Sequence, residues 1–147
     1  MKILKVRDVK TPTRGTPLSA GLDFYVPNDF EATILGPGCS INIPSGIKAK
    51  IPHGFCLKMD NKSGIALREG LIVGADVIDE DYQGEIHLHV VNVGRGSSHI
   101  KPGEKLVQGL LIPVSYELAE EVSSLEELYN GEVTARGEGG FGSTGKQ

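Results

Sequence analysis

The densest group of reactive side chains lies between residues 74 and 85, where five carboxylates fall within ten residues. Apolar runs flank the group on both sides, so it belongs to a connection between two strands. A carboxylate held on a rigid hairpin can orient and deprotonate a water molecule, which is the chemistry of a hydrolase. The alternative is an acidic loop that is merely solvated.

Two metal-binding interpretations of the same stretch fail on ligand count. A loop starting at Asp79 matches the first, third and sixth positions of a calcium-binding EF-hand, but Val90 stands where a bidentate glutamate is required. His87 and His89 share one face of a strand, as in metal-binding jelly rolls, but no third protein ligand follows. We therefore expect a pair of structural histidines.

A second group could hold an anion. Residues 60–66 supply the ammonium of Lys62, the hydroxyl of Ser63 and, at Gly64, a backbone N–H that an anion can approach closely. Taken alone, the segment is a turn. Gln108 lies inside an apolar strand, where its amide needs a structural or ligand partner.

The last twelve residues, 136–147, contain five glycines around one aromatic ring, two hydroxyls and two cations. Ordering such a segment costs roughly 1–2 kcal/mol per residue, and the segment has no core of its own to offset that cost. Its non-glycine side chains could close over a phosphorylated ligand with a flat ring. Two phosphate-binding glycine motifs also match here, but no helix follows either of them.

The elements that must position these groups are short strands separated by glycine and proline turns. Apolar runs or period-two alternation predict strands over residues 2–6, 22–26, 41–43, 47–51, 55–59, 71–73, 86–91, 106–114 and 116–122. The only predicted helix begins at Ser124, which forms a capping box with Glu127 and starts at most about two turns. This pattern predicts an all-β sandwich or barrel of jelly-roll type.

The composition argues against several classes of function. The chain has 147 residues and a net charge of -4, so it offers no overall attraction for nucleic acid. It contains no apolar run of the length of a signal peptide or a membrane span, and we expect a soluble, cytoplasmic protein of one domain. Cys39 and Cys56 lack metal-site spacing and are expected to be reduced thiols.

Five stretches in order resemble the motifs of the trimeric dUTPase family. They are Ala20-Gly-Leu-Asp23, Lys62-Ser-Gly-Ile-Ala66, Val77-Ile-Asp-Glu-Asp-Tyr-Gln-Gly-Glu85, Gly103-Glu-Lys-Leu-Val-Gln108 and Arg136-Gly-Glu-Gly-Gly-Phe-Gly-Ser-Thr-Gly145. The resemblance implies a jelly-roll-like barrel over residues 1–135 and an arm over residues 136–147 that closes over the active site. It also implies a homotrimer with active sites shared between subunits.

The resemblance implies hydrolysis of dUTP to dUMP and pyrophosphate with Mg²⁺, which limits uracil in DNA and supplies dUMP. Asp79 matches the residue that orients the attacking water, and Tyr82 matches the ring beneath the deoxyribose that excludes a 2′-hydroxyl. The hairpin backbone that reads the uracil edge corresponds to Gly74, Ala75, Asp76 and Val77.

The resemblance assigns the triphosphate to three other stretches. Lys62, Ser63 and Gly64 match the phosphate-contacting motif, and Gln108 matches a glutamine that contacts phosphate and water. Asp23 matches an aspartate that meets Mg²⁺ only through the water shell of the ion. In the arm, Phe141 would cover the uracil, and the remaining contacts fall to Arg136, Gly142, Ser143 and Thr144.

Three positions depart from the family pattern. Asp76 stands where the base-reading hairpin has glycine, Asn61 replaces proline, and Lys62 replaces arginine, so a point charge takes the place of a planar fork. Two other functions stay open. One is a dCTP deaminase of the same fold, and the other is an interaction protein whose partner surface is switched when nucleotide orders the arm.

Overall fold

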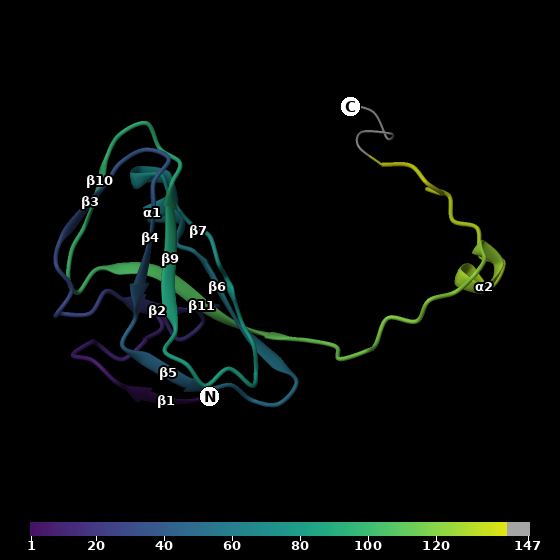
Figure 1. Cartoon of the computed structure of the whole chain (residues 1–147), viewed down its shortest axis with the longest axis horizontal. Coiled ribbons are helices and arrows are strands. Elements are labelled where there is room, and N and C mark those ends of the chain that lie inside the picture. Colours follow the sequence, from purple (N-terminus) through teal and green to yellow (C-terminus); the bar gives the residue numbers. More distant parts are fainter. Residues whose placement is uncertain (141–147) are drawn as a thin grey trace. The chain divides into compact units, whose positions relative to one another are not determined.

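The computed structural model describes residues 1–140 and divides the chain into two compact units. The first unit runs from Met1 to Ser115, and the second begins at Tyr116. Figure 1 shows that the strands all belong to the first unit, whereas helix α2 belongs to the second.

Eleven strands and one helix build the first unit. They are β1 (Lys2–Lys5), β2 (Leu22–Tyr25), β3 (Thr33–Leu35), β4 (Ser40–Pro44), β5 (Ile47–Lys50), β6 (Phe55–Asn61), α1 (Ser63–Glu69), β7 (Leu71–Val73), β8 (Val77–Ile78), β9 (His87–Asn92), β10 (Ser98–Ile100) and β11 (Lys105–Pro113). This arrangement confirms the predicted all-β, jelly-roll-like fold.

The strands pair in four small antiparallel sheets. One has the order β2-β11-β6-β8, one has the order β4-β9-β7, and the pairs β1-β5 and β3-β10 complete the set. The longest strand, β11, runs between β2 and β6 and pairs with both. Its Gly109 allows close packing there, because a Cβ at this position would lie 2.8 Å from the ring of Phe24 and 3.0 Å from Leu57.

The core is aliphatic and follows the predicted alternation. In and before β9, Ile86, Leu88 and Val90 are buried, while His87 and His89 on the other face are half-buried. In β5, Ile47 is buried and its lysine neighbours are exposed. One apolar cluster therefore lies beneath the sheets, as the period-two pattern of these strands requires.

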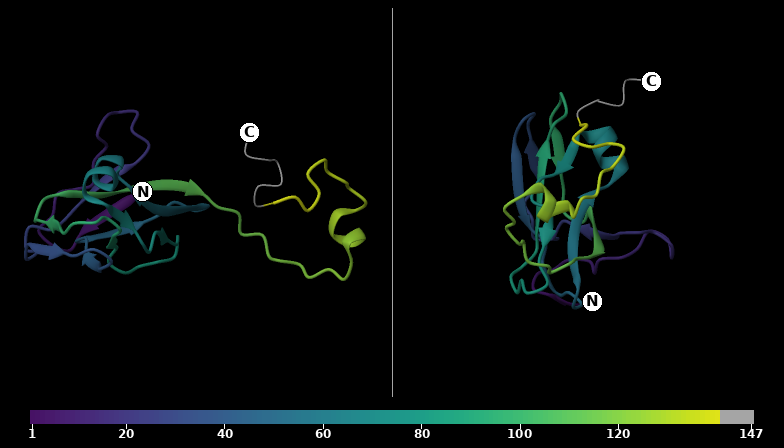
Figure 2. Two further views of the ribbon diagram at one scale, coloured as in Figure 1. Left: turned by 90° about the horizontal axis from the view of Figure 1, so that it is seen from above. Right: turned by 90° about the vertical axis from the view of Figure 1, so that its right-hand side faces the viewer.

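The connection between β1 and β2 projects from the body of the unit as a loop, which Figure 2 shows in both views. Arg14 holds its C-terminal end by donating Nη1 hydrogen bonds to the carbonyl oxygens of Ser19 and Ala20, the latter at 2.8 Å. The loop therefore enters β2 in a fixed conformation just before Asp23.

The sequence predicts a turn over residues 60–66, but the structure has helix α1 from Ser63 onward. Lys62 caps it without a side-chain hydrogen bond, so the usual N-terminal signal is missing from the sequence. Its end is regular: Gly70 adopts a left-handed conformation with φ of 68°, and its N–H donates to Ala66. The prediction of at most one short helix is wrong for this reason.

The second unit contains α2 (Leu125–Tyr129) in its described part. Ser124 accepts a hydrogen bond from the N–H of Glu127, which confirms the predicted cap. Residues 116–122 form no strand, contrary to the prediction, because no segment within residues 1–140 pairs with them. Apolar side chains stay exposed along the unit, including Leu118 at 93% and Val133 at 92%.

Two smaller expectations concern the cysteines and the membrane. Cys39 and Cys56 are both free thiols, as predicted. Among residues 1–140, no helix has the length and apolar character needed to cross a bilayer.

Candidate active site

Sheet register brings three of the sequence motifs together. Gln108 in β11 lies opposite Asp23 in β2 on one side and Asp60 in β6 on the other. Gln108 donates its side-chain N–H to the carbonyl oxygen of Asn61 at 2.8 Å, which gives this amide the partner it needs. Gly21 lies against it, since a Cβ there would come within 2.5 Å of the Gln108 oxygen.

Asp23 is the most buried carboxylate of this region, with 5% of its surface exposed. The ammonium of Lys62 donates to one carboxylate oxygen, and that of Lys105 contacts the other at 3.0 Å. Burial acts to raise the pKa of Asp23, but the hydrogen bonds and charges of the two lysines outweigh it and hold the pKa below its ordinary value. Asp23 is therefore an ionised, doubly paired carboxylate.

A cavity of about 490 Å³ opens beside this ion cluster and gathers the predicted phosphate residues. It is lined by Lys62, Ser63, Gly64, Ile65, Arg68, Glu69, Glu104, Lys105 and Gln108. Lys62, Ser63, Gly64 and Gln108 are thus brought together by the fold. Sequence reasoning missed Arg68 and Lys105 at this cavity, although Lys105 lies inside one matched motif and Arg68 follows another by two residues.

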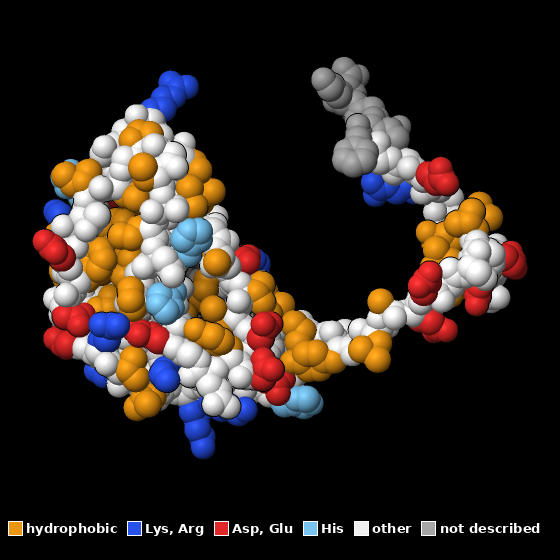
Figure 3. Space-filling model, in the orientation of Figure 1, with side chains coloured by type: hydrophobic (Ala, Val, Ile, Leu, Met, Phe, Trp, Pro, Cys, Tyr) orange, Lys and Arg blue, Asp and Glu red, His pale blue; other side chains and the backbone are white. Residues whose placement is uncertain are grey.

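The hairpin that leads into β9 forms a separate pocket of about 240 Å³. Its lining residues are Asn42, Ala75, Val77, Ile78, Asp79, Tyr82, His87 and His89. Figure 3 shows histidine side chains among apolar ones on the surface over β9. The pocket therefore combines apolar walls with a small number of polar groups, as ligand pockets usually do.

Asp79 and Tyr82 both line this pocket, but among the described residues only the side chain of Tyr82 has a hydrogen-bond partner. Tyr82 is fixed, because its hydroxyl donates to the carbonyl oxygen of Glu85 at 3.0 Å and packs against Gly84, where a Cβ would lie 2.2 Å from the hydroxyl oxygen. Within residues 1–140, the carboxylate of Asp79 accepts no hydrogen bond and forms no ion pair, and its residue is exposed. Its oxygens are therefore available to a water molecule or a ligand.

The backbone at the start of this hairpin is shaped by His89. The N–H of Ala75 donates to His89 Nδ1 at 2.9 Å, and the N–H of Gly74 donates to the His89 carbonyl oxygen at 3.0 Å. A Cβ at position 74 would lie 2.2 Å from Nδ1, so only glycine fits beneath the ring. His87 has a different partner, the carbonyl oxygen of Glu85 at 2.9 Å from Nδ1.

Asp76 is accommodated without backbone strain. Asn130 is the only non-glycine residue with a positive φ among the described residues, so position 76 does not need the freedom of glycine. The Asp76 carboxylate pairs with Lys58, and its carbonyl oxygen accepts the N–H of Met59 at 2.6 Å. The added negative charge is therefore compensated within the chain.

Asn61 connects the anion cavity to the hairpin within this chain. Its side-chain oxygen accepts the N–H of Val73 at 2.7 Å, and its own N–H donates to Asp60 at 2.7 Å. Proline at this position could make neither contact, because it lacks both the amide side chain and the N–H. Asn61 thus ties the anion cavity to the strand that leads into the hairpin.

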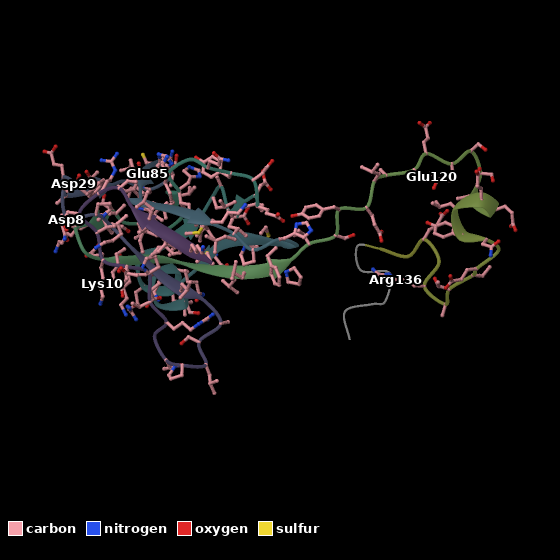
Figure 4. The ribbon with its side chains drawn as sticks, turned by 90° about the horizontal axis from the view of Figure 1, so that it is seen from below. Asp8, Lys10, Asp29, Glu85, Glu120 and Arg136 are labelled. Carbon is pink, nitrogen blue, oxygen red and sulfur yellow. The ribbon has the colours of Figure 1, made fainter. Side chains whose placement is uncertain are left out.

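Glu85 anchors the far end of the hairpin. It accepts the N–H of Gly46 at 2.7 Å and pairs with Arg7 Nε at 2.8 Å, and Arg7 also lies 3.6 Å from Asp29. Figure 4 shows Glu85 and Asp29 at one end of the first unit. Burial acts to raise the pKa of Glu85, but Arg7 and the Gly46 N–H together hold the pKa below its ordinary value.

The described residues include no group of three side chains that could hold a metal ion directly. The predicted arm residue Arg136 is described, and its Nε donates to the carbonyl oxygen of Gly139 at 2.7 Å. The predicted contacts Phe141, Gly142, Ser143 and Thr144 lie outside the described residues.

The chain is similar to known proteins over most of its length. A family model described as dUTPase matches residues 7–145. Deoxyuridine 5'-triphosphate nucleotidohydrolase of Aeromonas salmonicida is 36% identical, over 100% of this chain and 96% of the relative, and that of Mus musculus is 35% identical over 92% and 78%.

The same name recurs among solved structures. A variant of the dUTPase of Staphylococcus bacteriophage 80alpha, solved with dUpNHpp, superposes with a TM-score of 0.85. The alignment covers 98% of this chain and 97% of the phage chain at 21% identity, which shows a shared fold.

Proposed function

This chain belongs to the dUTPase family, and from that premise we propose that it hydrolyses dUTP to dUMP and pyrophosphate. The observation that carries the proposal is the unpaired carboxylate of Asp79 in the same pocket as the fixed ring of Tyr82. A water molecule held by Asp79 would attack the α-phosphorus, with Asp79 taking its proton. In the cell, this reaction limits uracil in DNA and supplies dUMP, and we place it in the cytoplasm.

The hairpin pocket would take the nucleoside. We assign the uracil edge to the backbone of Gly74, Ala75, Asp76 and Val77, a backbone supported by the contacts of His89. The ring of Tyr82 would lie beneath the deoxyribose and leave no room for a 2′-hydroxyl. Discrimination against UTP is then steric, and it depends on the hydrogen bond that fixes the Tyr82 hydroxyl.

The triphosphate would occupy the cavity beside Ser63 and Gly64, with Lys62 and Gln108 as further contacts. This cavity and the hairpin pocket have no lining residue in common. A homotrimer in which one subunit supplies the hairpin and a neighbour supplies the phosphate cavity would complete each site. The exposed apolar side chains after residue 115 would find partners in such an assembly.

Magnesium fits this site only as an ion that brings its own ligands. Both oxygens of Asp23 are taken by lysines, and the described residues offer no group of three ligands. Phosphate oxygens and water are the ligands that Mg²⁺ keeps most readily, and Asp23 would meet only its water shell. When bound, the ion would neutralise charge that develops on the leaving pyrophosphate.

The arm would complete the site by closing over bound nucleotide. We assign the base to Phe141 and the phosphates to Arg136, Ser143 and Thr144, with Gly142 allowing a close approach of the backbone. Contacts with the nucleotide would offset the cost of ordering a segment so rich in glycine.

Incubation of the purified protein with each deoxynucleoside triphosphate and with UTP, in the presence of Mg²⁺, tests the proposal. We expect pyrophosphate release from dUTP to exceed release from dCTP, dTTP or UTP by on the order of 100-fold or more, since each competitor lacks a required contact or adds a clash. Equal release from UTP or dCTP would overturn the assignment, and ammonia release from dCTP would indicate a deaminase.

The Asp79→Asn variant serves as the control for the catalytic step. It keeps the size of the side chain and removes the base, so nucleotide binding should persist while turnover falls by roughly 100-fold or more. An Asp79→Asn variant with normal turnover would remove Asp79 from this role.

A further inference from the structure

The anion cavity contains three cations, and two of them are already engaged. Lys62 and Lys105 both contact the carboxylate of Asp23, which is buried and ionised. An anion that enters this cavity must compete with the carboxylate of Asp23 for these two ammonium groups. Their net contribution to an incoming polyphosphate is therefore smaller than two free lysines would give.

The third cation, Arg68, is not engaged. Within residues 1–140 its guanidinium forms no hydrogen bond and no ion pair, although it lines the same cavity as Ser63 and Gly64. Of the nearby acids, Glu104 already accepts the N–H of Lys101 at 3.0 Å. Arg68 also lines the adjoining cavity of about 540 Å³, so its side chain lies on the boundary between the two spaces.

Gly64 shows how closely the guanidinium approaches the phosphate motif. A Cβ at position 64 would lie 2.9 Å from Nη2 and 3.1 Å from Nη1 of Arg68. Helix α1 causes this approach, because residues 64 and 68 are four positions apart and lie on the same face of the helix. The guanidinium thus lies directly against the residues assigned to the phosphates.

We propose that Arg68 supplies the triphosphate with a second guanidinium beside Arg136, and that it takes the place of the arginine that the family pattern has at position 62. The inference rests on the proposed function, because it names a further contact of the same substrate. A planar guanidinium binds two phosphate oxygens at once, whereas the ammonium of Lys62 acts as a point charge and is held by Asp23. Arg68 supplies the fork, and the pair of Lys62 with Asp23 holds the start of helix α1, which carries Ser63.

Calorimetric titration of the full-length protein with a non-hydrolysable dUTP analogue, with deoxyuridine and with inorganic tripolyphosphate tests this role. The Arg68→Gln variant should bind the analogue and tripolyphosphate roughly 10- to 100-fold more weakly, because it loses a charge-assisted contact. Its affinity for deoxyuridine should not change. Arg68→Lys should recover part of the loss, since it restores the charge without the fork.

Arg95→Gln is the matched control, because Arg95 lines only the adjoining cavity and is likewise unpaired among the described residues. It should bind all three ligands as the parent protein does. Equal losses in the two variants would show a general effect of charge and overturn the proposal. An Arg68→Gln variant with unchanged tripolyphosphate affinity would overturn it as well.

The double variant Lys62→Arg, Arg68→Gln separates contact from folding. Because a guanidinium at either position can serve, Lys62→Arg should restore most of the affinity for the analogue that Arg68→Gln loses. Failure of the parent protein to hydrolyse dUTP would refute the proposed function, whereas the tripolyphosphate titration would still decide whether Arg68 binds polyphosphate.

Discussion

His89 lies in β9 of the sheet β4-β9-β7, and its ring contacts the backbone that would read the base. Its Nδ1 accepts the N–H of Ala75 at 2.9 Å, so the ring proton of the neutral imidazole lies on Nε2. Its ring also occupies the space that a side chain at position 74 would need. The imidazole of His89 therefore orients the hairpin backbone by a hydrogen bond at Ala75 and limits its distance from β9 by contact at Gly74.

Replacing His89 by leucine should weaken base recognition without removing the catalytic group. The change deletes the acceptor for Ala75, and a hydrogen bond of this kind contributes about 0.5–1.5 kcal/mol. We expect the KM for dUTP to rise roughly 2- to 10-fold with kcat nearly unchanged, measured by steady-state pyrophosphate release. His99→Leu, on the separate strand β10, is the control, and a fall in kcat alone would contradict a positioning role.

The residue types of the site could be predicted from the sequence, but several partners could not. Asp76 departs from the family pattern, and its tolerance depends on Lys58, which lies 18 residues earlier and is brought close by the pairing of β6 with β8. Lys62 matches a phosphate motif by position, yet its ammonium is held by Asp23. Both facts arise from register, which a single sequence does not display.

At the scale of elements, the sequence likewise predicted some strands and helices correctly and missed others, because it does not show which segments come into contact. Alternation predicted β5 and β9 because each buries one face. It failed over residues 116–122, where the alternation is present but the described part of the chain offers no partner strand. Helix α1 escaped prediction because its first residue has no side-chain cap. The sequence pattern therefore shows which face is apolar more reliably than it shows what that face meets.

The hairpin before β9 should be sensitive to acid through Glu85. Its pKa in the folded protein lies below its ordinary value of 4.5, since Arg7 and the Gly46 N–H stabilise the charged form. The unfolded chain then binds more protons as the pH falls through this range, so the stabilisation by Glu85 is present above pH 4.5 and lost below it.

The Glu85→Gln variant should therefore be less stable at neutral pH, by about 1–2 kcal/mol, because it loses a charged hydrogen-bond acceptor in a partly exposed site. Its stability should also fall less steeply than that of the parent below pH 4.5. Urea unfolding at a series of pH values measures both effects. Glu31→Gln, a change in an exposed loop, should leave the curve in place, and identical acid limbs for Glu85→Gln and the parent would contradict the argument.

At the scale of the whole molecule, the core and the proposed arm are separable. Every buried hydrophobic residue of the described chain lies between Val9 and Val107, and α2 buries none. The first unit thus carries the packing that stabilises the fold. Residues 136–147 are predicted to contact bound nucleotide and to add nothing to the packing of this core.

A chain truncated after Ala135 should keep its thermal unfolding midpoint and the sedimentation of the proposed trimer, since none of the buried core residues of the described chain is removed. Its turnover of dUTP should fall on the order of 100-fold, because substrate and water would no longer be held in the reacting geometry. Restoring residues 136–147 with Phe141 and Arg136 both changed to alanine should fail to rescue turnover, whereas restoring the native segment should succeed. Full activity of the truncated chain would refute the closing arm, and loss of the trimer would show that these residues serve assembly.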